Sequence, residues 1–319
     1  MLKKFIFWLK CARLYSAPIT IFSWAVIFIY SLKAGGNVFY GILALIGMLF
    51  VHLATNLSDD YFDYKVLSKD EKFFASAKNC KCAYLKNNQA TITDLRNTIL
   101  VFLGIGGIIG AFLFFAAGKY VALLAIIGAI IAVSYPKFSL NGLGEIAVII
   151  AYGPLLFEGV YYVMTGKFSF EVLILSFACA LMTNTILYAH MLMDFDQDEC
   201  SHKKTLCRSL KTKTNALNFI LVFYITSFLL IGYLSFRTHN YLYLLTFLTI
   251  PMIIDLYFHL KSYNEDKTYL PKIYPWHYPL DSWEKILKSG DAPFYFRFLY
   301  SRNIMVLFMF LTCIAIIFG

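Results

Sequence analysis

The sequence predicts an all-α, polytopic membrane protein. Its 319 residues are 60% hydrophobic and only 15% charged, whereas soluble domains are roughly 45–50% apolar and about 25% charged. The apolar residues form long, nearly continuous runs with tight returns between them. A bilayer core about 30 Å thick needs ~20 apolar residues per helix, so these runs favour membrane-spanning helices over barrel strands.

Nine transmembrane helices are expected in one bundle. No long soluble linker divides them, so residues 1–319 are expected to form a single domain. Thr93 is expected to cap the helix that enters the third span. The expected spans are 14–34, 38–57, 98–117, 119–135, 144–164, 169–192, 216–236, 240–260 and 303–319.

The basic residues predict the orientation. With the N-terminus inside, 24 of the 28 Lys and Arg residues fall on one face, which leaves only Lys33, Lys119, Lys167 and Arg237 on the other. The positive-inside rule places the richer face, with the N-terminus and the loops 57–97 and 193–215, in the cytoplasm. The protein is therefore expected in the cytoplasmic (inner) membrane, and its net charge of +9 indicates anionic ligands and a membrane surface. No nucleic-acid partner is expected.

Segment 261–302 mixes aromatic and basic residues with four prolines. It is too polar to span and too apolar to be disordered, which is typical of a segment in the membrane interface. An in-plane anchor is favoured, and a partial lid or substrate gate remains the alternative.

The first acidic cluster follows the second apolar run, in ATNLSDDYFDYK. Spacings of i, i+4 and i+7 place Asn56, Asp60 and Asp63 on one helical face, with Asp59 beside them and His52 one turn deeper. Like charges at i,i+4 destabilise a helix. A divalent cation bound by oxygen ligands is expected to neutralise them.

The second acidic cluster follows the sixth run, in MLMDFDQDE. Asp194 and Asp198 share a face at i,i+4, whereas Asp196 points elsewhere. Carboxylates near hydrocarbon are costly and indicate function. Two clusters on one side of the membrane predict a site where Mg²⁺ holds a diphosphate and stabilises it as a leaving group. Either cluster alone is also consistent with a solvated helix end.

Basic side chains are expected at the phosphate oxygens. The candidates are Arg13, Lys137, Lys203 and Lys204, although any single lysine is also consistent with an ordinary cytoplasmic charge. A diphosphate that ionises beneath an apolar bundle suggests an isoprenoid substrate, which leaves behind an allylic cation. Aromatic side chains stabilise such a cation.

These motifs resemble those of the UbiA superfamily of intramembrane prenyltransferases, over about two thirds of the chain. Residues 13–18 read RLYSAP where the family reads RPxTLP, and residues 56–63 read NLSDDYFD where it reads NLxNDYxD. Residues 142–145 (GLGE), 161–166 (YYVMTG) and 194–206 (DFDQDECSHKKTL) also follow the family pattern. The resemblance is nearest to the branch that prenylates 1,4-dihydroxy-2-naphthoate in menaquinone biosynthesis. The chain departs from that branch at five positions, namely Asp59, His190, Met191, Met193 and His202. The branch has Asn, Asn, Asn, Arg and Gly there, respectively.

The resemblance implies a bundle around a central lipid-side cavity and an electrophilic aromatic substitution. It implies that polyprenyl diphosphate is held by Mg²⁺, and that a small aromatic acceptor attacks the allylic cation. His52 or Asp59 is a candidate to orient or deprotonate the acceptor hydroxyl. The implied Mg²⁺ ligands are Asn56, Asp60, Asp63, Asp194 and Asp198, with Arg13, Lys137, Lys203 and Lys204 on the phosphates.

Other functions stay open at this point. The acceptor is alternatively 4-hydroxybenzoate or another small molecule. A cation-coupled transporter would carry ionisable residues near mid-membrane in several helices, whereas only Glu158 and Asp255 lie there. A non-catalytic lipid-binding relative is a third class. Glu145 is expected to act structurally at a helix start, and Glu158 needs a partner that the sequence does not name. The oligomeric state is open.

Overall fold

The computed structural model describes residues 2–67, 82–200 and 204–319, and all regular structure among them is helical. Eight helical runs are long and apolar enough to cross a membrane, and a ninth, Tyr120–Tyr135, is apolar but shorter. The all-α prediction is confirmed, and the described spans correspond one by one to the nine expected runs.

The long elements are continuous helices or pairs of helices joined end to end. They are α2 (Ala17–Lys33), α3 (Val38–Leu67), α6 (Ile92–Ala117), α7 (Tyr120–Leu140), α8 (Gly144–Ile150) with η2 (Ala151–Leu155) and α9 (Leu156–Thr165), α10 (Phe170–Met193), α13 (Lys213–Thr238), η3 (Tyr241–Thr249) with α14 (Ile250–Glu265), and α16 (Ala292–Phe318). Short elements connect them: α1 (Leu2–Cys11), η1 (Leu14–Ser16), α5 (Ala83–Lys86), α11 (Phe195–Cys200), α12 (Leu206–Ser209), η4 (Pro275–His277) and α15 (Trp283–Ser289).

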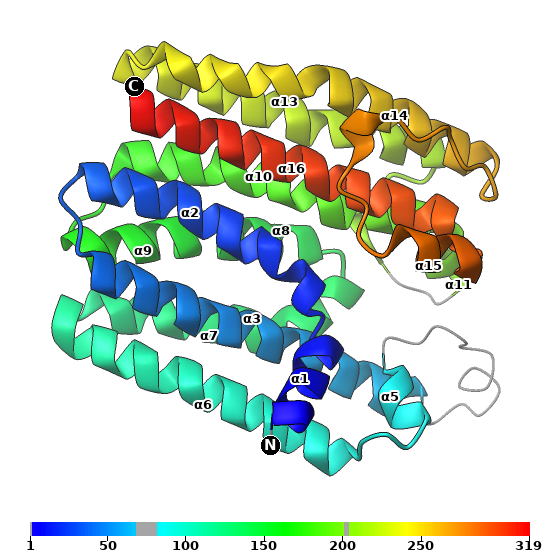
Figure 1. Ribbon diagram of the computed structural model, residues 1–319, viewed down its shortest axis with the longest axis horizontal. Helices are drawn as coiled ribbons and strands as arrows, with labels where there is room; N and C mark the ends of the chain where they lie inside the picture. Colours follow the sequence, from blue (N-terminus) through cyan, green and yellow to red (C-terminus); the bar gives the residue numbers. More distant parts are fainter. Residues whose placement is uncertain (1, 68–81, 201–203) are drawn as a thin grey trace.

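The long helices lie side by side, and α5 and α11 are at the same end of the bundle (Figure 1). This end is called the acidic end below, because both acidic clusters lie there. Helix α10 is central: 78% of its most apolar stretch is buried, against 17% in α6 at the bundle's edge. It packs on α13, α16 and α8, so the second acidic cluster, at its C-terminal end, is attached to the best-packed helix.

Two predicted helix ends are wrong. Helix α3 does not stop near residue 57 but continues to Leu67, so the first acidic cluster lies on a rigid helix and not on a loop. Helix α6 is capped by Thr91, not Thr93. The Thr91 side chain accepts from the backbone N–H of Asp94, and the Asp94 side chain accepts from the N–H of Thr91. This is a reciprocal capping box. The sequence carries its signature, since Asp94 lies three positions after Thr91, whereas Arg96 lies three positions after Thr93.

Segment 261–302 divides into four parts: the end of α14, a strap, α15 and the start of α16. Helix α14 extends to Glu265, and α16 starts at Ala292 with Pro293 in its first turn, so the last span begins well before the expected residue 303. Composition misleads here because Arg297 and Arg302 are buried and satisfied, so they do not meet lipid. Between the two helices, residues 266–282 form an extended strap that crosses α16 (Figure 1).

Buried donors of α16 hold the strap in place. Arg297 donates to the carbonyls of Tyr269 and His259, at 3.2 and 2.6 Å. Asn303 Nδ2 donates to the carbonyls of His277 and Pro279, at 2.8 and 2.9 Å. Since each broken bond would leave a buried polar group unpaired, these contacts describe a fixed strap and give no indication of a hinged lid.

Candidate functional site

The first acidic cluster lies on the last turns of α3, and two of its carboxylates contact Arg13. Asp60 is fully buried; it pairs with Arg13 and accepts a hydrogen bond from the Tyr84 hydroxyl at 3.1 Å. Asp59 Oδ2 lies 3.5 Å from the other terminal nitrogen of Arg13 and is partly exposed. Asp63 is also partly buried. One guanidinium therefore spans two adjacent carboxylates.

Arg13 is held by the turn between α1 and α2. Its backbone is left-handed, with φ 60° and ψ 51°, which is unusual for a residue with a Cβ. Burial disfavours its charge, but the neighbouring carboxylates of Asp60 and Asp59 outweigh this and raise the pKa of Arg13 above its ordinary value. Burial, followed by the charge of Asp60, raises the pKa of Tyr84. Tyr84 therefore stays protonated and remains a donor to Asp60.

The second acidic cluster starts at the C-terminus of α10. Asp194 Oδ2 lies 3.2 Å from His190 Nδ1, and the backbone N–H of Asp198 donates to the carbonyl of Asp194 at 2.8 Å. Asp198 is buried. Asp196 instead forms ion pairs with Lys213 and Lys267, at 2.8 and 2.9 Å. Hydrogen bonds from those two lysines hold the pKa of Asp196 below its usual value.

Two residues from intervening elements lie near members of the two clusters. Tyr135 of α7 lies within electrostatic range of Asp59 and of Glu145. Glu145, at the start of α8, is buried and lies near Asp198 and the backbone of Leu206. The turn before α8 is pressed against the segment after α11, since a Cβ on Gly142 would lie 2.5 Å from the carbonyl oxygen of Lys204.

The four residues expected to bind phosphate differ in their exposure and in their contacts. Arg13 meets the first cluster directly. Lys137 and Lys204 are exposed and form no ion pair within the described part of the chain. Lys203 lies outside the described residues.

His52 lies at the centre of a hydrogen-bond network one turn deeper than the first cluster. Its Nε2 lies 2.9 Å from Ser16 Oγ. Its Nδ1 lies 2.6 Å from Thr20 Oγ1 and 3.1 Å from the Tyr152 hydroxyl. Asn56 joins the network by donating to Ser16 Oγ at 3.2 Å. Sequence reasoning found His52 and Asn56 but missed Ser16, Thr20 and Tyr152, although the i,i+4 spacing of Ser16 and Thr20 matches that of His52 and Asn56.

The donor set at the acidic end fits a hard divalent cation. Its groups are carboxylates and one amide, the oxygen ligands that Mg²⁺ prefers. Asn56, Asp60, Asp63, Asp194 and Asp198 remain the ligands expected from the sequence; of these, Asp60 is fully buried and its two carboxylate oxygens contact Arg13 and Tyr84.

A second group of potential ligands lies under the strap. Asp255 Oδ2 lies 2.9 Å from His277 Nε2 and 3.0 Å from the Tyr300 hydroxyl, and Asp255 Oδ1 lies 3.2 Å from His259 Nε2. The backbone N–H of Tyr274 donates to His277 Nδ1 at 3.1 Å, so the proton of neutral His277 is on Nε2 and is donated to Asp255. A metal-binding imidazole would donate from its other nitrogen, so the geometry favours a hydrogen-bonded brace.

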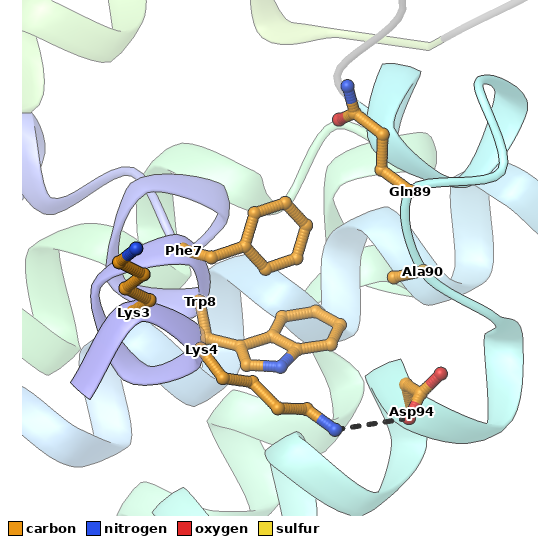
Figure 2. A pocket seen from close by; sticks show the side chains of 7 residues that line it. All are labelled: Lys3, Lys4, Phe7, Trp8, Gln89, Ala90 and Asp94. Atoms are coloured by element: carbon orange, nitrogen blue, oxygen red, sulfur yellow. Dashed lines mark ion pairs between the residues drawn. The ribbon is translucent and has the colours of Figure 1, made fainter. Parts of the chain in front are cut away.

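The sequence left the partner of Glu158 open. Glu158 is buried, and its carboxylate accepts from the backbone N–H of Ser169 at 3.4 Å, which supplies the missing partner. A pocket of about 370 Å³ lies between α1 and the turn before α6. Figure 2 shows Trp8 and Phe7 on one side of it and the Lys4–Asp94 ion pair, 3.7 Å long, at its rim. None of the predicted site residues lines this pocket.

Comparisons with known proteins agree with this architecture. The chain is 25% identical over 218 residues to the 1,4-dihydroxy-2-naphthoate octaprenyltransferase of Haemophilus influenzae, across 64% of this chain and 69% of that protein. It is 26% identical over 185 residues to the 2-carboxy-1,4-naphthoquinone phytyltransferase of Synechocystis sp., across 54% of this chain and 60% of that protein.

Solved structures share the fold. A UbiA homolog from Archaeoglobus fulgidus bound to DMAPP and Mg²⁺ superposes with a TM-score of 0.59 at 14% identity, covering 98% of this chain and 99% of that one. The apo UbiA homolog from Aeropyrum pernix K1 gives 0.62 at 17% identity, covering 91% and 96%. The profile of the UbiA prenyltransferase family matches residues 17–273. This match covers most of the chain, which therefore belongs to the UbiA prenyltransferase family.

Proposed function

We propose that the protein transfers a polyprenyl group from polyprenyl diphosphate to 1,4-dihydroxy-2-naphthoate, in a Mg²⁺-dependent reaction. The observation that carries this proposal is that both carboxylate clusters lie at the same end of the bundle. The similarity to a 1,4-dihydroxy-2-naphthoate octaprenyltransferase and to a 2-carboxy-1,4-naphthoquinone phytyltransferase supports the choice of acceptor. The substantial match to those relatives favours this acceptor over 4-hydroxybenzoate. The excess of Lys and Arg at the acidic end supports placing that end in the cytoplasm.

Bound Mg²⁺ would neutralise the diphosphate and stabilise it as a leaving group. Asn56, Asp60 and Asp63 from α3, with Asp194 and Asp198 from α10 and α11, would hold it. Lys137 and Lys204 are exposed at this end and are free to reach phosphate oxygens. Arg13 pairs with Asp59 and Asp60 and would orient their carboxylates.

The transfer balances as a substitution at carbon. The allylic C–O bond breaks, and its electron pair leaves with the diphosphate. A π electron pair of the acceptor ring forms the new C–C bond, and the ring becomes aromatic again when it loses a proton or its carboxyl group. A neighbouring phenolic hydroxyl increases the electron density of that ring, and the His52 network is the described group suited to hold such a hydroxyl.

Reconstitution with Mg²⁺, a polyprenyl diphosphate and single aromatic acids tests the proposal. We expect 1,4-dihydroxy-2-naphthoate to be prenylated and 4-hydroxybenzoate not to be. Asp198→Asn should lose at least about a hundredfold in kcat/KM, because it removes a charged ligand. Asp196→Asn, two residues away and paired with lysines, is the matched control and should keep near-normal activity. Prenylation of 4-hydroxybenzoate alone would reject the proposed acceptor.

A further inference from the structure

The pocket between α1 and the turn before α6, called the α1 pocket below, combines aromatic and charged side chains. Phe7 and Trp8 form its aromatic side, and Lys3 and Lys4 stand one helical turn before them on α1 (Figure 2). This i,i+4 spacing places each lysine on the same face of the helix as an aromatic ring. The volume of about 370 Å³ is within the range of small-molecule sites, roughly 300–1,000 Å³.

Trp8 brings an unused hydrogen-bond donor to the α1 pocket. It is only 4% exposed, and edge-on contacts with the rings of Phe7 and Tyr84, at 5.3 and 5.8 Å between centroids, fix its orientation. Its indole N–H has no hydrogen-bond acceptor among the described residues, although a buried Trp usually has one. The nitrogen is not enclosed by that part of the chain, and Figure 2 shows it on the edge of the ring that faces the Lys4 side chain. An acceptor that enters the pocket therefore meets a ready donor.

The charges that line the α1 pocket leave an excess of +1, from two lysines and one aspartate. Asp94 is already engaged, because its Oδ2 accepts from the backbone N–H and the hydroxyl of Thr91, at 3.2 and 2.7 Å. Its Oδ1 lies 3.7 Å from Lys4 Nζ. Lys3 forms no ion pair with any residue that the structure describes. A singly charged anion would balance this pocket, whereas an ammonium group would meet two like charges.

The α1 pocket lies at the start of a membrane-spanning helix. Helix α6 is a candidate span along its whole length and is the least buried of the eight. Val101 and Ile108 follow Asp94 at i+7 and i+14, which places them on the same face of α6, and they are 58% and 73% exposed. The exposed ring of Phe5 on α1 meets Phe102 of α6 edge-on, with centroids 6.5 Å apart. The charged pocket therefore continues into an apolar surface that suits acyl chains.

We propose that the α1 pocket binds the phosphate of an anionic phospholipid, whose acyl chains lie along the exposed face of α6. Lys3 and Lys4 pair with the phosphate, and the indole N–H of Trp8 donates to one of its oxygens, where an ionised acceptor strengthens the bond. A headgroup with one phosphodiester and no amine matches the charge of the pocket. Polyprenyl diphosphate carries more negative charge than the pocket balances, and none of the predicted site residues lines it. The inference does not depend on the proposed function.

Lipid titration of the full-length protein in a neutral detergent tests the site. The probe is dihexanoyl phosphatidylglycerol below its micelle-forming concentration, and native mass spectrometry counts the bound lipids and gives the dissociation constant. We expect one equivalent to bind with preference. Dihexanoyl phosphatidylethanolamine, whose amine would face the lysines, should bind at least about threefold more weakly. Equal binding of the two lipids would overturn the proposal.

Lysine variants separate a site from general attraction between a basic helix and anionic lipid. Lys3→Gln and Lys4→Gln should each weaken the binding of phosphatidylglycerol about threefold, since exposed charge pairs contribute little. Lys10→Gln is the matched control, because Lys10 is an exposed lysine of the same helix that does not line the pocket. Its loss should leave the dissociation constant unchanged. Equal losses in all three variants would overturn the proposal.

Asp94 supplies a test of the opposite sign. Asp94→Asn removes the negative charge of the pocket and frees Lys4, so it should bind phosphatidylglycerol about threefold more tightly. Thr91→Ala weakens the same helix cap but keeps the charge, so it should not tighten binding. A role of Asp94 in the cap alone predicts no gain in either variant. Unchanged or weaker binding by Asp94→Asn would therefore contradict the proposal.

Trp8→Phe tests the indole donor. It keeps an aromatic ring beside Phe7 and Tyr84 but removes the N–H, and it should weaken binding about tenfold, as expected for a hydrogen bond to a charged acceptor. Wild-type affinity in a folded Trp8→Phe protein would contradict this contact. If the variant does not fold, the lysine and Asp94 variants still decide the proposal, because those side chains are at least partly exposed.

Competitors identify the source of the phosphate. Inorganic phosphate and glycerol 3-phosphate lack acyl chains, and they should not displace the lipid at equal concentration; displacement there would indicate a site for soluble phosphate and overturn the proposal. Displacement by 1,4-dihydroxy-2-naphthoate or by a polyprenyl diphosphate would assign the pocket to a substrate instead. If the protein prenylates no acceptor but the lysine and Asp94 effects are found, only the proposed function fails. If it prenylates the acceptor and those effects are absent, only this inference fails.

Discussion

Arg13 forms an ion pair with the fully buried carboxylate of Asp60. The same guanidinium contacts Asp59. Arg13, in the turn before the first span, therefore neutralises part of the acidic cluster on α3. This pairing determines how the cluster should respond when either partner is removed.

Removing Arg13 should destabilise the protein strongly. Arg13→Ala leaves Asp60 buried without its cation, which typically costs about 3–5 kcal/mol. Thermal unfolding in detergent measures the change. Added Mg²⁺ should raise the lowered unfolding temperature of this variant part of the way back, because it supplies positive charge at the same carboxylates. The double variant Arg13→Ala/Asp60→Asn should be more stable than Arg13→Ala alone, and a double variant that is less stable would refute the pairing.

The Tyr84 hydroxyl is expected to stabilise the folded protein only through its hydrogen bond to Asp60. Tyr84→Phe removes a hydrogen bond to a charged group, which is worth about 1.5–3 kcal/mol, and it preserves the ring contacts with Trp8 and Phe7. The free energy of unfolding is the measurement. In an Asp60→Asn background the same substitution should cost clearly less. An equal cost in both backgrounds would show that the hydroxyl acts elsewhere.

The ion pairs of Asp196 predict a pH window. Because the lysines lower its pKa, Asp196 stabilises the folded state above the ordinary aspartate value of about 4 and loses that contribution as pH falls through the lowered value. The side chain is 45% exposed, so the effect should not exceed about 1 kcal/mol. The difference in thermal midpoint between wild type and Asp196→Asn should be constant from pH 6 to 8 and vanish in acid. A difference that grows between pH 6 and 8 would argue against this assignment.

The cluster of Asp255, His259 and His277 should behave as a brace and not as a metal site. Added Zn²⁺ should change the thermal midpoint of wild type and of His259→Asn alike, because His277 Nε2 donates to Asp255. His277→Ala should destabilise the protein by removing the strap's buried contact. Stoichiometric zinc that survives dialysis in wild type, and is lost in His259→Asn, would contradict the hydrogen-bond assignment.

The sequence was sufficient for the fold because lipid imposes a simple rule. Runs of about 20 apolar residues recur along the chain, and the described helices coincide with them. Prediction failed where polar residues are buried by their neighbours. Arg297 and Arg302 look incompatible with a span, but the strap satisfies them, so α16 starts earlier than expected. Those partners lie 28 and 23 residues away in sequence and leave no local pattern.

The candidate site was only partly predictable, for a related reason. Carboxylates at helical spacing identify Asp60 and Asp198 from local periodicity alone. The contacts of Tyr84 and Tyr152 depend on how distant elements meet: Tyr84 comes from a short helix after α3, and Tyr152 from a π-helical turn around Pro154. Tyrosine is frequent in this chain, with 23 residues, so composition gives no reason to select these two.

The account depends most on the two acidic clusters acting as one site. The direct measurement is Mg²⁺-dependent binding of a polyprenyl diphosphate to wild type, Asp63→Asn, Asp198→Asn and the double variant. We predict that each single substitution weakens binding by about 10- to 100-fold. The loss of affinity in the double variant should be much smaller than the product of the two single losses, because the clusters share one ligand. Binding at wild-type affinity in either single variant, or strictly multiplicative losses, would contradict a shared site.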